Sequence, residues 1–137
     1  MNHYKYEELE IGQKESFEVE ITEEMLDSFR KITGDMNPLH KDDEFARAKG
    51  FDSHAAFGML TASFLSTLAG VYLPGESSLI HNTEIKFMKP VFVGDKLTVK
   101  GEVAEKNDAY NTIRIKVEMR NADGAKVLRG SMQIGIV

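Results

Sequence analysis

An aspartate and a histidine stand five residues apart in a segment that regular helix cannot span. Residues 29–40 have the sequence FRKITGDMNPLH. Gly34 favours the end of a helix, the residue before a proline favours extended geometry, and Pro38 has no backbone N–H to donate. A bent loop can therefore direct the side chains of Asp35 and His40 into one small volume. An acid and a base that share one water molecule can add that water to a substrate or remove it.

Taken singly, each of the two residues also has an ordinary structural explanation. An aspartate after a glycine commonly bonds to nearby backbone amides in a turn. An isolated histidine is commonly a partly buried side chain with a satisfied ring. The chemical interpretation therefore depends on Asp35 and His40 occurring together within one continuous pattern.

That pattern resembles the signature of the MaoC-like (R)-specific enoyl-CoA hydratases and dehydratases. The match runs through small-Gly-Asp-x-Asn-Pro-aliphatic-His and continues to a small residue, Ala46. Residues 58–63 and 89–95 resemble two further segments of the family, a helix opening and a strand-turn-strand unit. The resemblance implies a single MaoC-like domain over residues 1–137, with the α+β hot-dog fold. In that fold an antiparallel sheet wraps around one long central helix.

The resemblance also implies an activity. Asp35 and His40 would be the catalytic pair that activates water, and the reaction would be the reversible hydration of trans-2-enoyl thioesters to (R)-3-hydroxyacyl thioesters. Coenzyme A or acyl carrier protein would be part of the substrate, and no metal or other cofactor is expected. The likeness further implies a homodimer or a higher homo-oligomer with sites near the interface.

Three further residues have expected supporting roles. The long helix is predicted to start near Gly58, whose N–H at a helix N-terminus suits a developing enolate oxygen, although close packing explains a glycine there equally. Ser63 matches the family position whose hydroxyl supports the catalytic Asp. The alternative interpretation is that Ser63 is simply one of the small residues along this helix. Asn37 is expected to shape the loop through bonds to the backbone.

Phe57 is a departure from the family pattern, which usually has histidine just before Gly-Met-Leu. A phenyl ring cannot hydrogen-bond to a thioester or to water at this substrate-binding position. His54 lies three residues earlier and is the nearest replacement. Two alternative functions follow: a hot-dog acyl thioesterase, and a non-catalytic acyl-thioester-binding or assembly module. The long helix lacks Asp and Glu, which disfavours the thioesterase.

Composition sets the outer limits. A chain of 137 residues with 42% hydrophobic and 28% charged residues is typical of one globular domain. The absence of cysteine excludes thiolate chemistry, and a formal charge of −5 gives no support for nucleic-acid binding. Residues 53–75 contain no Asp, Glu, Lys or Arg, which a buried helix explains better than a membrane span. The polar start of the chain predicts no secretory signal and a cytoplasmic protein.

The predicted strands and helices lie on both sides of the signature segment. Alternation predicts a strand over residues 14–21, and Thr22 is placed to cap a helix whose apolar stripe contains Met25, Phe29 and Ile32. Asp42 is placed to cap a short helix that ends near Gly50. A long helix is predicted over residues 55–72, followed by four alternating strands.

Overall fold

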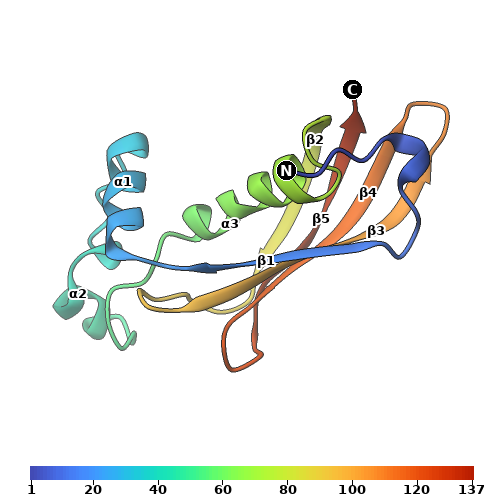
Figure 1. Cartoon of the computed structure of the whole chain (residues 1–137). Coiled ribbons are helices and arrows are strands. Elements are labelled where there is room, and N and C mark those ends of the chain that lie inside the picture. Colours follow the sequence, from blue (N-terminus) through green and yellow to red (C-terminus); the bar gives the residue numbers. More distant parts are fainter.

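The computed structural model describes all 137 residues and contains one antiparallel sheet of five strands (Figure 1). The strands are β1 (Lys14–Glu20), β2 (Ser78–Phe87), β3 (Lys96–Asn107), β4 (Thr112–Arg120) and β5 (Lys126–Ile136). Their spatial order is β1-β3-β4-β5-β2, and every neighbouring pair is antiparallel. Strands β1 and β2 therefore form the two edges of the sheet.

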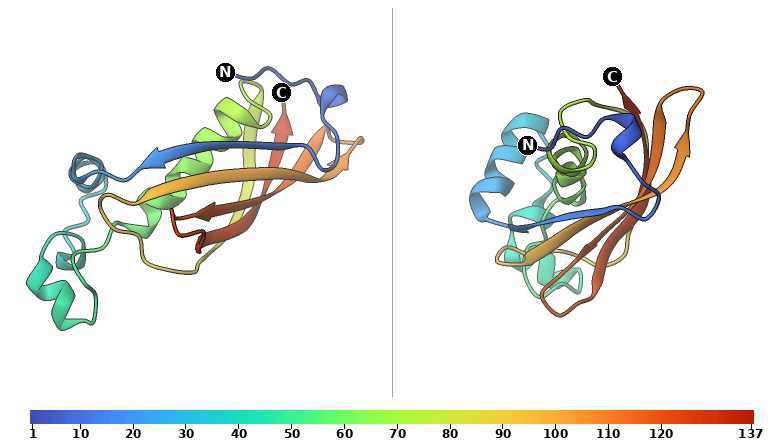
Figure 2. Two further views of the ribbon diagram at one scale, coloured as in Figure 1. Left: turned by 60° about the horizontal axis from the view of Figure 1, so that its bottom comes forward. Right: turned by 45° about the vertical axis from the view of Figure 1, so that its right-hand side comes forward.

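The helices lie on one side of this sheet and at one end of it. They are α1 (Glu23–Thr33), α2 (Asp43–Ala48) and α3 (Gly58–Thr67), and a π-helical turn, Leu68–Tyr72, continues α3. Figure 2 shows α3 against one face of the curved sheet, whereas α1 and α2 extend beyond its end. This is the hot-dog arrangement expected from the sequence. None of the helices combines the length and apolar character needed to cross a membrane.

Alternation of apolar and polar residues in the central strands β3 and β4 explains why the sheet has one covered face. In β4, Ile113, Ile115, Val117 and Met119 belong to the core that α3 completes. The residues between them are polar and point to the opposite face. Gly101 of β3 lets the helical segment approach, because a Cβ there would lie 3.1 Å from Leu68 Cδ2. The central helix is thus held tightly and can position the groups at its first turn.

Two details of the helices differ from the sequence predictions. The long helix begins at Gly58 rather than at residue 55, because Ala55 forms an isolated bridge with Phe92 and the Ala56 N–H donates to the Val91 carbonyl at 2.7 Å. The predicted apolar stripe of α1 is wrong at Ile32, which is 83% exposed. Arg30 is buried in its place, at 7% exposure.

Predicted caps fix the helices on both sides of the signature loop. The Thr22 hydroxyl accepts from the Met25 N–H at 3.2 Å, and the Asp42 carboxylate accepts from the first turn of α2. Gly34 ends α1 in the left-handed conformation, with φ of 74°. The loop that carries Asp35 and His40 therefore begins and ends at defined points.

The end of α1 provides a test of this framework. No atom lies within 4 Å of a Cβ built on Gly34, so Gly34→Ala adds only the strain of a left-handed alanine. We expect it to lower the free energy of unfolding by about 1–2 kcal/mol in urea titrations. Gly34→Asn is the matched control and should cost clearly less, because asparagine tolerates this conformation. Equal losses for the two variants would contradict the assigned backbone geometry.

Candidate active site

The fold brings the predicted acid and base to one hollow. Asp35, from the loop after α1, and His40, from the 3-10 turn η2 (Pro38–His40), both line a hollow of about 580 Å³ at the start of α3. The hollow is also lined by Phe29, Thr33, Phe57, Gly58, Met59 and Phe87. Two titratable side chains, a helix N-terminus and apolar walls are therefore found together.

A backbone contact fixes the imidazole of His40. Its Nδ1 lies 2.8 Å from the carbonyl oxygen of Ala55. Because a carbonyl can only accept a hydrogen bond, Nδ1 must carry the proton of this contact. In the neutral ring, Nε2 is then left with a free lone pair. The geometry therefore prepares Nε2 to accept a proton.

Phe57 holds the same ring from one side. Its centroid lies 4.1 Å from that of His40, with 32° between the ring planes, and 4.9 Å from that of Phe29. Only 2% of Phe57 is exposed. The residue that departs from the family pattern thus packs on the imidazole of His40 and restricts its orientation.

Arg30 is a site residue for which sequence reasoning predicted no role. One terminal nitrogen of its guanidinium donates to the His40 carbonyl at 3.1 Å, and the second terminal nitrogen donates to Asp27 at 2.8 Å. The carbon of the guanidinium lies 5.5 Å from the centroid of Phe57. A buried charge needs such partners. Its signal in the sequence was an arginine directly after Phe29, one of the apolar residues of α1.

The loop is shaped by side chain to backbone bonds, as expected for Asn37. The Asp35 Oδ1 accepts from the Asn37 N–H at 3.0 Å, and the Asn37 Oδ1 accepts from the Leu39 N–H at 3.0 Å. The second oxygen of Asp35 has no partner in the chain and is free to accept from water or substrate.

The N-terminus of α3 is the predicted donor site. Its N-cap residue, Phe57, provides no side-chain acceptor, and the N–H groups of Gly58, Met59 and Leu60 have no acceptor within the chain. Unpaired N–H groups at this end favour a negative ligand atom. A Cβ on Gly58 would lie 3.2 Å from Phe87 Cε1, so Gly58 is closely packed, which is compatible with the predicted donor role.

Ser63 is placed differently from the family-based expectation. Its hydroxyl donates to the Leu60 carbonyl at 2.6 Å, one turn back on α3. It does not line the hollow that contains Asp35, and the expected bond to Asp35 is not formed.

His54 does not replace the missing histidine, because it is engaged elsewhere. Its Nδ1 lies 2.6 Å from Asp43 and its Nε2 lies 2.8 Å from Glu23. The hydrogen bond with Asp43 is the main cause that raises the pKa of His54, and the bond with Glu23 adds to it, against the effect of burial. His54 thus joins α1, α2 and the segment that leads into α3.

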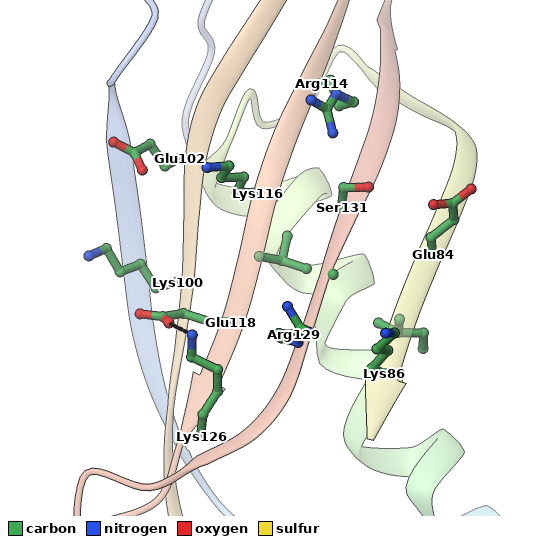
Figure 3. A pocket seen from close by; sticks show the side chains of 13 residues that line it. Glu84, Lys86, Lys100, Glu102, Arg114, Lys116, Glu118, Lys126, Arg129 and Ser131 are labelled. Carbon is green, nitrogen blue, oxygen red and sulfur yellow. Dashed lines mark ion pairs between the residues drawn. The ribbon is translucent and has the colours of Figure 1, made fainter. Parts of the chain in front are cut away.

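A larger hollow lies on the opposite face of the sheet (Figure 3). It measures about 610 Å³ and is lined mainly by charged side chains of neighbouring strands, such as Lys86 and Arg129. Lys126 pairs there with Glu118 at 3.3 Å. Neither Asp35 nor His40 reaches this face, so it is the solvent face of the sheet and not the candidate active site.

Comparison with known proteins places the chain in a family. The MaoC like domain matches residues 7–125, so the chain belongs to the MaoC-like domain family. It is 33% identical to the (R)-specific enoyl-CoA hydratase of Aeromonas caviae over 122 residues, which cover 89% of this chain and 91% of that protein.

Two further matches agree with this assignment. The chain is 38% identical over 100 residues to the 3-hydroxybutyryl-CoA dehydratase of Methylorubrum extorquens, a match that covers 73% of this chain and spans 64% of that protein's length. The unliganded structure of an R-hydratase from Pseudomonas aeruginosa superimposes with a TM-score of 0.90 at 34% identity, covering 96% of this chain and 84% of that one.

The contacts of His54 with Glu23 and Asp43 should make the stability of the fold depend on pH. A pKa raised on folding contributes stability that is complete below the ordinary value of 6.5 and is lost as the pH rises through the raised pKa. Above it, the neutral ring keeps its bond to Asp43 but turns a lone pair toward Glu23. We expect His54→Gln to lower the free energy of unfolding by about 1–2 kcal/mol in acid and by less at alkaline pH.

Denaturant titrations of the wild type and the variant across this pH range measure the difference directly. His81→Gln is the matched control, since His81 is an exposed histidine on β2 without an ion pair. A loss for His54→Gln that stays constant with pH would show that protonated His54 does not stabilise the fold.

Proposed function

We propose that this protein hydrates trans-2-enoyl thioesters to (R)-3-hydroxyacyl thioesters and catalyses the reverse dehydration. The observation that carries the proposal is the Nδ1 contact of His40 with Ala55, which leaves Nε2 of the neutral ring free to accept a proton, on a residue that lines the same hollow as Asp35. The similarity to hydratases along nearly the whole chain supports the same reaction.

All protons of the proposed reaction come from the added water and are handled by Asp35 and His40. Water donates one hydrogen bond to the free oxygen of Asp35 and loses its other proton to Nε2 of His40. Its oxygen bonds to C3 of the enoyl group, and the electrons of the double bond move toward the thioester carbonyl. The imidazolium then gives its proton to C2. The net change is addition of one water, with Asp35 and His40 restored.

The thioester carbonyl is the group that gains negative charge during this step. Placed at the start of α3, its oxygen meets the N–H groups of Gly58 and Met59, which have no other acceptor. Fixed donors of this kind stabilise an oxyanion without having to reorient. The chemistry requires no group beyond the thioester carrier of the substrate.

Phe57 stands where the family usually has a histidine, so its role bears on whether the protein is an active hydratase. Because it packs on His40, we propose that it orients the imidazole instead of binding the thioester as a histidine would.

An assay with crotonyl-CoA separates the three candidate functions. Loss of the enoyl absorbance without thiol release identifies a hydratase, and thiol release identifies a thioesterase. The absence of both changes identifies a non-catalytic binder.

Substitution of the catalytic pair tests the roles. We expect Asp35→Asn and His40→Ala each to lower kcat for crotonyl-CoA hydration by about 10²–10⁴-fold, because each removes an acid–base or water-holding group. Circular dichroism should remain unchanged, since both residues lie outside the buried core. Asp123→Asn, which changes an exposed aspartate in the turn between β4 and β5, is the matched control. Wild-type rates in both catalytic variants would refute the assignment.

We also propose that the protein forms a homodimer through the β2 edge. This strand has no neighbour on one side, and it exposes Leu79 and Ile80. Phe87, at the end of the same strand, is also exposed and lines the hollow with Asp35. Unpaired strand edges with apolar side chains favour pairing with another chain. A second copy on this edge would cover one side of the site.

Light scattering at micromolar concentration should give the mass of two chains. Ile80→Lys is expected to shift the protein toward the monomer and to lower its activity together with it. Ile11→Lys is the control, because Ile11 is an even more exposed apolar residue away from β2. A monomeric wild type that is fully active would contradict the proposal.

A further inference from the structure

One charged side chain is buried in this protein, and it takes no part in the proposed reaction. Arg30 is 7% exposed and is the only Asp, Glu, Lys or Arg among the buried residues. Its Nε has no hydrogen-bond partner. A buried charge is costly, and an apolar side chain of similar volume often fills such a position without loss of stability. The charge of Arg30 therefore needs an explanation other than packing.

The contacts of Arg30 lead to His40 by two routes. One terminal nitrogen donates to the main-chain carbonyl of His40 at 3.1 Å. The guanidinium carbon also lies 5.5 Å from the centroid of the Phe57 ring, a separation at which a cation is attracted to an aromatic face. That ring packs in turn on the imidazole of His40, with 4.1 Å between the centroids. Arg30 thus holds the backbone of His40 and also the ring that covers its imidazole.

We infer that Arg30 and Phe57 position the imidazole of His40 as one unit, in which the effect of each residue depends on the other. Arg30 does not line the hollow that contains Asp35, so it is a positioning residue and not a catalytic one. The inference rests on the proposed function only where it gives the imidazole a chemical task. The dependence between Arg30 and Phe57 is a property of the fold.

The same unit accounts for the phenylalanine at position 57, where the family usually has histidine. A phenyl ring offers its electron-rich face to the guanidinium of Arg30. A histidine in the place of this ring, once protonated, would set a second positive charge beside Arg30 in a buried region, which is unfavourable. Position 57 is therefore aromatic and uncharged because position 30 carries a buried cation.

A double-mutant cycle with crotonyl-CoA tests the dependence. Arg30→Met and Phe57→Leu should each lower kcat by about tenfold and change KM by less than about twofold, because they misplace the imidazole without removing it. The double variant should lose clearly less than the roughly hundredfold expected of independent residues. Lys31→Met, which changes the neighbouring exposed cation of α1, is the matched control and should keep the wild-type kcat.

Phe57→His tests why position 57 is aromatic. We expect this substitution to lower kcat several-fold in the wild-type background, because it places an ionisable ring beside the Arg30 cation. In the Arg30→Met background the same substitution should cost clearly less, since the repelling charge is gone. An equal loss in both backgrounds would show that the charge of Arg30 does not determine which residue position 57 accepts.

Nitrogen NMR of the histidine rings tests the positioning without catalysis. The wild-type His40 ring should be a single neutral form with the proton on Nδ1, as its bond to the Ala55 carbonyl requires. Arg30→Met and Phe57→Leu should each make the form protonated on Nε2 detectable. Urea titrations under the same conditions show that each variant is folded, so a change in the ring is separated from a loss of structure.

The outcomes separate the two proposals. Losses of kcat that multiply in the double variant overturn the shared role of Arg30 and Phe57. A His40 ring that keeps its wild-type signals in folded Arg30→Met overturns the positioning role. A wild type that does not hydrate crotonyl-CoA overturns the proposed function alone, and the NMR comparison then decides the positioning of His40 by itself.

Discussion

One hydrogen bond, from the His40 ring to the Ala55 carbonyl, links the two halves of the site. It connects the signature loop to the extended residues that lead into α3, and it determines which ring nitrogen has the proton. The Ala55 N–H donates in turn to the Leu39 carbonyl at 3.0 Å, so the two segments are held at more than one point. The base that we propose, Nε2 of His40, and its place beside the helix N-terminus both depend on this contact.

The remainder of the fold maintains this contact. The α3 helix is packed on the sheet, so its first N–H groups and Phe57 stay in place without a side-chain cap. The helices α1 and α2 extend beyond the sheet and lack its support (Figures 1 and 2). Buried Arg30 and the ion pairs of His54 supply the missing attachment, through bonds to the loop and between the helices. Residues that take no part in the proposed reaction therefore maintain the geometry of the site.

Local rules in the sequence were sufficient for most elements. Alternation predicted the strands, and the side chains of Thr22, Gly34 and Asp42 predicted the helix ends that the structure confirms. The signature predicted that Asp35 and His40 would meet, because the proline bend is a local property. The family and the fold were also predicted correctly from this segment.

What the sequence did not predict depends on contacts between distant segments. The start of α3 is displaced by bonds from Ala55 and Ala56 to the residues before β3. Burial of Arg30 in place of Ile32 depends on the His40 carbonyl. The hydroxyl of Ser63 donates to a carbonyl of its own helix, and the position of Ser63 in the motif does not predict this partner. None of these contacts has a periodic or compositional signal.

The protonation of His40 is the most direct test of the account. Nitrogen NMR of the ¹⁵N-histidine-labelled protein at alkaline pH distinguishes the two neutral forms of each imidazole, and a His40→Gln sample assigns the signal among the four histidines. The account predicts a His40 ring with the proton on Nδ1 and a free Nε2. A ring protonated on Nε2 would contradict it, because the nitrogen proposed to take the proton from water would already be occupied.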